Sequence, residues 1–226
     1  MRQAPEITRP RRYRLLCPIA RAMDRIGDRW ALLILRDLHA GPARFTELQV
    51  GLPGVASNLL TNRLRQLEAD GLVRRRDAEY GTTLYELTET GEGTAVLLFE
   101  LAQFGAQFPP DKEVHRPGNL RTIALTFRVA CQRAADPSMN VRAQLVVDDE
   151  RLALTVTNGV VDVEYGVANE PEVTLTTSYE PLVAAGDGRM PLDEFASKHS
   201  RVEGDPEKVG ILIGLLGRAL VRRKSR

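Results

Sequence analysis

Several features that indicate disulfide-stabilised, metal-binding or membrane proteins are scarce or absent in this 226-residue sequence. The two cysteines are too few for a disulfide framework or for the paired cysteines of a zinc site. The three histidines lie far apart, which leaves no local metal-binding motif. No apolar run approaches the roughly 20 residues that span a bilayer, and the N-terminus is not followed by a signal-peptide core. We therefore expect a cytoplasmic protein with no metal, no other cofactor and no membrane contact.

The chain also carries almost no net charge, since positive and negative residues balance to a formal value of +1. The total therefore does not indicate a general polyanion-binding protein, and the positions of the charges matter more. Arginines are concentrated in an N-terminal arm over residues 1–16 and in the triplet Arg74, Arg75 and Arg76. These are the expected phosphate contacts. The acids, histidines and serines form no recognisable catalytic motif, so we do not expect an enzyme.

The length of the chain favours two domains, each with enough apolar residues for its own core. Prolines at 109, 110 and 117 break any continuing helix and favour a linker over residues 109–118. The sequence thus predicts an N-terminal domain over 17–108 and a C-terminal domain over 119–226.

Short helices are expected at the start of the first domain. Pro18 stands where a helix tolerates proline, and apolar residues recur at helical spacing as far as Ile26. Asp28 is placed to cap a second helix, which Gly41-Pro42 ends. A compact helix over 45–50 and a turn at Pro53-Gly54 then lead to a longer helix over 56–70.

The helix over 56–70 has two different faces. At about 100° per residue, leucines group on one side. The other side carries polar residues, with Ser57 near the helix start: Asn58, Thr61, Asn62 and Arg65. Because Asn can pair bidentately with adenine and Arg with guanine, this face is suited to reading base edges. An ordinary solvated face would have the same composition, so the choice between the two depends on the segment that comes after the helix.

That segment is a basic hairpin. Two β-prone stretches flank a turn near residues 77–81, and the first carries Arg74, Arg75 and Arg76. A polar-faced helix followed by a basic hairpin is the layout of a winged helix-turn-helix, whose helix enters the major groove while the wing grips the backbone. Thr88 is placed to cap a last helix over 89–107, whose wide apolar stripe needs a partner.

Ordered sequence blocks over about ninety residues resemble the HxlR family of bacterial winged-helix regulators. The blocks include Cys17-Pro18, Gly27-Asp28-Arg29-Trp30, Gly41-Pro42, Leu60-Thr61-Asn62-Arg63-Leu64-Arg65 and Tyr85-Glu86-Leu87-Thr88. The resemblance implies a homodimer joined through its first and last helices, bound to a near-palindromic operator of double-stranded DNA and acting as a repressor or activator. Two recognition helices about 34 Å apart would then meet successive major grooves.

The same resemblance implies a redox-sensor role for Cys17, because several family members respond to oxidation or alkylation at that position. A helix N-terminus with Arg14 and Arg21 nearby in sequence would favour the thiolate. The alternative is a small residue buried in the dimer contact. Cys131 falls on an apolar helical stripe and is expected in the core.

The second domain is expected to have an α+β fold, an antiparallel sheet packed with helices. A helix ends near Asp136-Pro137, and Asn158-Gly159 is a strong hairpin signal. The expected strands cover 141–147, 151–157, 160–165 and 173–177, and later helices cover 179–185, 192–198 and a segment that begins at Pro206 after the cap Asp205. This order resembles the sterol carrier protein fold over about residues 118–220. The resemblance implies an apolar tunnel for a small apolar ligand; a solid core or a dimer contact is the alternative.

The sequence therefore predicts a homodimeric transcriptional regulator that binds DNA and is controlled by a small apolar ligand or by thiol oxidation. The alternative is a lipid carrier or enzyme in which the winged helix contacts another protein. Asn58 and Arg65 argue against that alternative, because docking helices more often present aromatic or apolar anchors.

Overall fold

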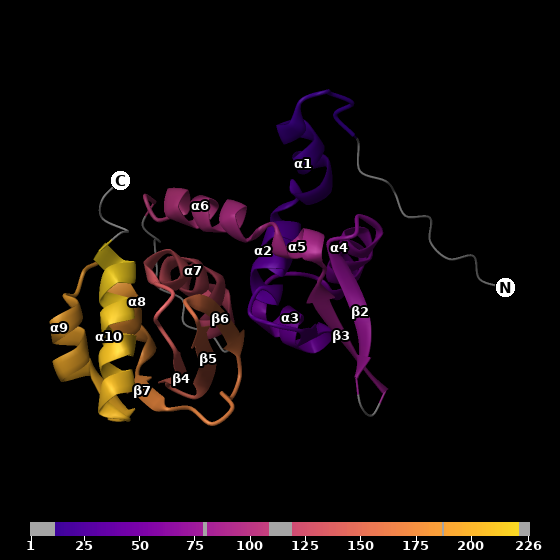
Figure 1. Cartoon of the computed structure of the whole chain (residues 1–226). Helices are drawn as coiled ribbons and strands as arrows, with labels where there is room; N and C mark the ends of the chain where they lie inside the picture. The colour runs from indigo at the N-terminus through magenta and orange to yellow at the C-terminus, as the bar shows by residue number, and fades with distance from the viewer. Residues whose placement is uncertain (1–11, 79–80, 109–118, 187, 222–226) are drawn as a thin grey trace. The chain divides into compact units, whose positions relative to one another are not determined.

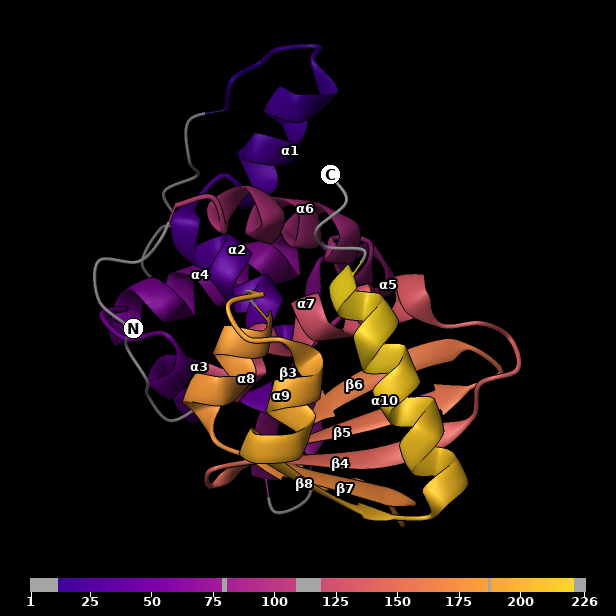
Figure 2. The same cartoon turned by 90° about the vertical axis from the view of Figure 1, so that its left-hand side faces the viewer.

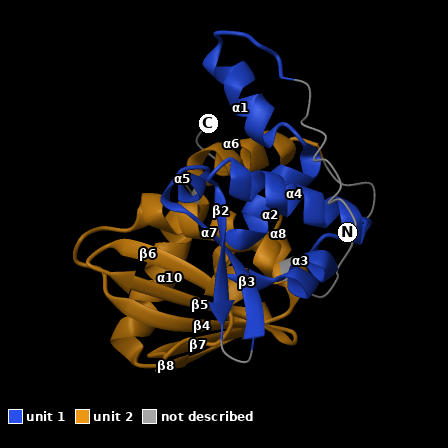
Figure 3. Ribbon diagram, turned by 90° about the vertical axis from the view of Figure 1, so that its right-hand side faces the viewer, with its two compact units in different colours: residues 1–38, 42–94 blue, residues 39–41, 95–226 orange. Residues whose placement is uncertain are grey.

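The computed structural model describes residues 12–78, 81–108, 119–186 and 188–221. The expected linker over 109–118 and most of the N-terminal arm lie outside these residues. The chain forms two compact units (Figure 3): unit 1 comprises residues 1–38 and 42–94, and unit 2 comprises residues 39–41 and 95–226. Each unit is described by itself.

Unit 1 is a helical domain with a small sheet (Figure 1). Its elements are α1 (Pro18–Ile26), α2 (Arg29–Leu38), β1 (Ala43–Arg44), α3 (Phe45–Gly51), α4 (Ser57–Ala69), β2 (Val73–Ala78), β3 (Thr82–Leu87) and α5 (Glu89–Glu92). The strand order is β1-β3-β2, and both pairings are antiparallel. Fully buried leucines from α2, α3 and α4 form the core, which includes Leu35, Leu48, Leu60 and Leu64. The predicted winged-helix elements of this unit are therefore confirmed.

The single helix predicted over 89–107 is wrong, because two helices occupy this segment. The first is α5, and the second is α6 (Ala95–Gly105). Thr88 does cap α5, since its side chain accepts a hydrogen bond from the Gly91 amide (3.1 Å). Gly91 packs so closely against the backbone that an added Cβ would clash with the Leu72 carbonyl oxygen. Two glycines within four residues disfavour helix continuation, and α5 ends at Gly93.

The division between the units differs from the domains expected from the sequence. Helix α6, expected in the first domain, belongs to unit 2, where Arg133 pairs with Glu100 (2.7 Å) and its guanidinium lies over the Phe99 ring. Residues 39–41 also belong to unit 2. There the Ala40 carbonyl accepts a hydrogen bond from the Tyr165 amide (2.8 Å).

Unit 2 is a five-stranded sheet with helices. Its remaining elements are α7 (Asn119–Ala134), β4 (Val141–Val147), β5 (Glu150–Thr157), β6 (Val160–Tyr165), β7 (Val173–Thr177), α8 (Tyr179–Gly186), α9 (Leu192–Glu194), a π-helical turn (Phe195–His199), β8 (Ser200–Gly204) and α10 (Pro206–Val221). Figure 2 shows α10 lying across the strands, and buried residues of α7 and α10 join those of the sheet in one core. The α+β class expected for this domain is confirmed.

The expectation of a wholly antiparallel sheet is wrong at one pairing. The strand order is β6-β5-β4-β7-β8, and β7 runs parallel to β4. The chain leaves the edge strand β6 and crosses to the other side of β4, so it enters β7 in the direction of β4. Gln144 holds this crossing segment: its Oε1 accepts a hydrogen bond from the Ala168 amide (2.7 Å), and its Nε2 donates to the Gly166 carbonyl (3.2 Å).

Other local predictions in unit 2 have mixed outcomes. The Asn158-Gly159 hairpin is confirmed, and both residues have positive φ (51° and 76°). The helix expected over 192–198 is a short α-helix followed by the π-helical turn, and β8 was not predicted. Cys131 is fully buried in the core, as expected. Within the described residues, no helix is long and apolar enough to cross a membrane.

Candidate nucleic-acid interface

Helix α4 presents the predicted polar face to solvent. Leu60, Leu64 and Leu67 are buried on its inner side and fix its orientation in unit 1. On the outer side Ser57, Asn58, Asn62 and Arg65 are exposed and Thr61 is half-buried. The five residues proposed to contact bases can therefore be reached from solvent.

These five residues differ in how far their polar groups are already engaged. Three form local hydrogen bonds at the helix start: Ser57 accepts one from Gln49 of α3 (2.5 Å), Thr61 donates to the Ser57 carbonyl (2.8 Å), and Asn58 Oδ1 accepts from the Leu59 amide (2.8 Å). Neither Asn62 nor Arg65 forms a side-chain hydrogen bond or ion pair with any residue of the described chain. Their donors and acceptors are available to a ligand.

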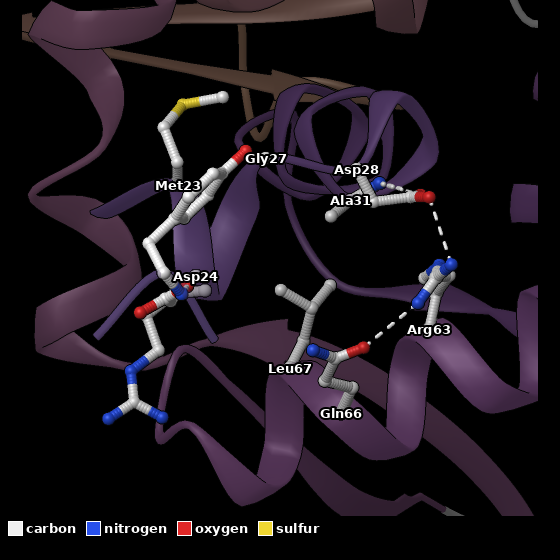
Figure 4. A pocket seen from close by; sticks show the side chains of 10 residues that line it. Met23, Asp24, Gly27, Asp28, Ala31, Arg63, Gln66 and Leu67 are labelled. Carbon is white, nitrogen blue, oxygen red and sulfur yellow. Dashed lines mark hydrogen bonds and ion pairs between the residues drawn. The ribbon is translucent and has the colours of Figure 1, made fainter. Parts of the chain in front are cut away.

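A second network connects α4 to α1 and to the start of α2. Arg63 forms an ion pair with Asp28 (2.9 Å) and donates to Gln66 (2.9 Å), as Figure 4 shows. Asp28 also caps α2 by accepting a hydrogen bond from the Trp30 amide (2.9 Å). Arg25 of α1 pairs with Asp70 directly after α4. A pocket of about 210 Å³ lies among these side chains.

The wing arginines occupy both faces of β2. Arg74 and Arg76 lie on one face, and Arg75 lies on the other, because side chains alternate along a strand. The Arg74 Nε atom is 2.7 Å from Glu86 Oε1, and the Arg76 Nε atom is 2.9 Å from Glu86 Oε2. One carboxylate of β3 therefore holds two guanidinium groups.

The guanidinium of Arg75 connects the wing to the helix. It makes a two-point contact with Glu68 of α4, with its Nε 2.8 Å from Oε1 and its Nη2 2.9 Å from Oε2. It also lies over the ring of Tyr85, its direct neighbour on β3, at 5.6 Å from the ring centre. These contacts orient the hairpin against α4.

Sequence reasoning missed the two carboxylates that pair with the wing, Glu68 and Glu86. Glu86 stands directly opposite Arg74 in the strand register, which only the folded hairpin reveals. The ion pairs reduce the positive charge that the hairpin presents, so the arginine triplet alone overstates it.

The two cysteines have contrasting surroundings. Cys17 is exposed and precedes Pro18 at the start of α1, where its carbonyl accepts a hydrogen bond from the Arg21 amide (3.1 Å). Cys131 is buried, and burial raises the pKa of its thiol to about 12. Among the residues that the structure describes, no group of three or more histidines, cysteines and acids could hold a metal ion.

Comparisons with known proteins match the N-terminal part of the chain. Residues 25–113 match the family model described as HxlR-like helix-turn-helix. The uncharacterized HTH-type transcriptional regulator YvaP of Bacillus subtilis is 33% identical over 97 residues, which are 41% of this chain and 89% of that protein. A regulator of the same description from Methanothermobacter thermautotrophicus is 32% identical over 100 residues, 43% of this chain and 76% of that protein.

Solved structures give similar coverage. The reduced form of the transcriptional regulator YodB from B. subtilis is 29% identical, with 44% of this chain and all of that chain aligned at a TM-score of 0.38. The redox regulator HypR in its oxidized form is 29% identical, with 43% of this chain and all of that chain aligned at a TM-score of 0.39.

Proposed function

This chain belongs to the HxlR-like helix-turn-helix family of transcriptional regulators, and we propose that it acts as a homodimer on a near-palindromic operator of double-stranded DNA. The observation that carries the proposal is the outer face of α4, where Asn62 and Arg65 are exposed and have no side-chain partner in the described chain. Amide and guanidinium groups in this state can pair bidentately with adenine and guanine.

The remaining polar residues of α4 and the wing divide the contacts. Ser57, Asn58 and Thr61 lie at the start of α4, the part of a recognition helix that approaches the bases. Arg74 and Arg76 share the outer face of the wing and contact phosphates there. Arg75 is proposed to contact phosphate as well, and its contacts with Glu68 and Tyr85 also orient the wing.

Exposed apolar side chains on α1 and α6 support the homodimer. Ile19 and Met23 on α1 and Leu97, Leu101 and Phe104 on α6 are all large, apolar and exposed in the single chain. Such residues on two helices favour burial against a second copy. Native mass spectrometry measures the subunit number directly, and a monomer at micromolar concentration would contradict the dimer.

Unit 2 is proposed to be a sterol carrier-like domain that binds a small apolar molecule. The order of its strands and helices supports this, together with half-buried apolar residues such as Leu182, Met190 and Leu192 beside the core. A ligand there would release DNA only if it bound the DNA-incompetent state more tightly. Mass spectrometry of the freshly purified protein after denaturation would detect such a compound.

Fluorescence anisotropy with a duplex from the region upstream of the gene tests the DNA contacts. We expect Arg65→Ala to cost about 1–3 kcal/mol, mainly at one base step. We expect Arg74→Ala to weaken binding to all sequences and to lower the salt slope by at most about 1 for each protomer, because Glu86 compensates part of its charge. Arg201→Ala is the control, because it removes the same charge from an exposed position on β8.

Two outcomes would contradict this proposal. Equal loss for Arg65→Ala at every operator variant would remove that residue from direct readout. Failure of the wild-type protein to bind any duplex at low salt, where phosphate attraction is strongest, would refute DNA binding itself.

A further inference from the structure

We propose that Glu86 is an internal competitor of DNA phosphate, which limits how much positive charge the wing offers to a duplex. This inference rests on the proposed DNA contact of the wing. It assigns a role to a residue that carries the wrong charge for binding DNA and yet lies between two arginines of the proposed backbone contact.

The geometry places Glu86 at the centre of the outer face of the wing. It stands directly opposite Arg74 in the strand register, and Arg76 is two residues further along the same face. Both of its oxygens are used, each by the Nε of one arginine. Its side chain is 13% exposed, whereas those of Arg74 and Arg76 are 67% and 51% exposed. The carboxylate thus lies beneath two guanidinium groups that project into solvent.

Glu86 is ionised under ordinary conditions. Burial raises the pKa of its carboxyl group, but hydrogen bonds from Arg76 and Arg74 and the positive charge of both arginines outweigh this effect, so that the pKa lies below its usual value. Glu86 therefore carries a full negative charge at neutral pH, next to the position that a phosphate would occupy.

Two carboxylates compensate most of the positive charge of the three wing arginines. Glu86 faces Arg74 and Arg76, and Glu68 faces Arg75, so that three arginines are matched by two carboxylates. The arginine partners of Glu86 are 67% and 51% exposed, so that solvent and other anions reach their guanidinium groups, and solvent-screened ion pairs are weak. A phosphate can therefore displace the Glu86 carboxylate from an arginine. The displaced carboxylate still repels the phosphate, because both are negatively charged.

Glu68 differs from Glu86 in its role. Its two-point contact with Arg75 lies on the other face of β2 and joins the hairpin to α4. Removing Glu68 would disturb the orientation of the wing, whereas removing the charge of Glu86 leaves that connection in place. Glu86 is therefore the residue at which compensation can be tested separately from orientation.

The test is Glu86→Gln, which keeps the size of the side chain and one oxygen acceptor. We expect tighter binding to every duplex, specific or random, because phosphate contacts do not depend on sequence. The slope of log Kd against log salt should become steeper by about 0.9 for each protomer, the contribution of one phosphate contact, and so by about 1.8 for the homodimer. The affinity ratio of variant to wild type should then be about 12-fold larger at 50 mM than at 200 mM salt for the homodimer.

Glu203→Gln is the matched control, because it neutralises an exposed, arginine-paired glutamate on β8 of unit 2. It should leave both affinity and salt slope unchanged. A second readout compares the effect of Arg76→Ala in the wild type with its effect in the Glu86→Gln variant. If Glu86 competes with phosphate, the loss caused by Arg76→Ala is larger when residue 86 is Gln, because the arginine then contributes its full charge.

The outcomes separate this inference from the proposed function. Duplex binding by the wild type, with weaker or unchanged binding and an unchanged salt slope for a folded Glu86→Gln protein, overturns the inference alone. An equal effect of Arg76→Ala in both backgrounds also overturns it. No binding of any duplex by the wild type at low salt overturns the proposed function.

Discussion

Asp28 joins the start of α2 to helix α4, and its replacement should destabilise unit 1 by an amount that can be divided between two contacts. Its Oδ1 accepts hydrogen bonds from the Trp30 and Ala31 amides (2.9 and 3.4 Å) and so caps α2. Its Oδ2 lies 2.9 Å from the Arg63 guanidinium. The cap is local to α2, whereas the ion pair fixes the helix that carries the proposed base contacts.

The magnitudes of the two contributions depend on their surroundings. Loss of an N-cap side chain costs about 1 kcal/mol. The ion pair is partly screened, with side-chain exposures of 32% for Asp28 and 25% for Arg63, and contributes up to about 1 kcal/mol. We expect Asp28→Ala to cost about 2 kcal/mol in total. Asp28→Asn should cost about 1 kcal/mol, because Asn still caps the helix.

Urea unfolding followed by tryptophan fluorescence measures these losses. Trp30 is the only tryptophan in the chain and lies in α2, so its signal reports unit 1. Because Trp30 is close to Asp28, the midpoint and slope of the transition must be used rather than the intensity. Equal destabilisation by Asp28→Ala and Asp28→Asn would refute the cap.

A double-mutant cycle with Arg63→Ala isolates the ion pair. Residues in direct contact show a coupling energy, whereas independent residues give additive losses. The Arg63 Nε is buried and has no hydrogen-bond partner among the described residues, so this side chain depends on its remaining contacts. Additivity of Asp28→Asn and Arg63→Ala within about 0.3 kcal/mol would refute the ion-pair contribution.

Two further predictions concern the cysteines and unit 2. The native protein should react rapidly with a thiol reagent at Cys17 alone, because burial raises the pKa of the Cys131 thiol to about 12. In denaturant both cysteines should react. Mass spectrometry of the labelled protein measures this, and labelling of Cys131 under native conditions would contradict it. Gln144→Leu should destabilise unit 2 by about 3 kcal/mol, because it leaves buried backbone groups such as the Ala168 amide without their partner. Hydrogen exchange at residues 166–168 should become faster, and an unchanged exchange rate there would contradict the role of Gln144.

The elements whose signals are local could be predicted from the sequence. Asp28 before an apolar helix, Thr88 as the cap of a helix that begins at Glu89, and Asn158-Gly159 between two strands all act through neighbours within a few residues. Such signals require no knowledge of which distant segments meet. The winged-helix order and the hairpin of unit 2 could be derived from them.

The features that were missed depend on contacts between distant segments. The break after α5 lies beside Gly91, which must lack a side chain because the Leu72 carbonyl lies against it. The parallel pairing of β7 with β4 requires a crossing segment that Gln144 holds from inside the sheet. Neither partner is indicated by the residues adjacent in sequence, since hydrophobic periodicity identifies a strand without giving its neighbour.

The charge of the wing could not be predicted from the sequence for the same reason. Three successive arginines indicate a strongly positive strand, but the positive charge that remains uncompensated depends on carboxylates of the opposite strand and of α4. A register shifted by one residue would turn Glu86 to the other face, away from Arg74 and Arg76, and would leave both arginines uncompensated. Because register is a property of the folded hairpin, the electrostatic contribution of the wing is set by pairing as much as by composition. If the wing contacts phosphate as proposed, arginine substitutions in it measure the exchange of an internal carboxylate for an external phosphate, rather than the loss of a free charge.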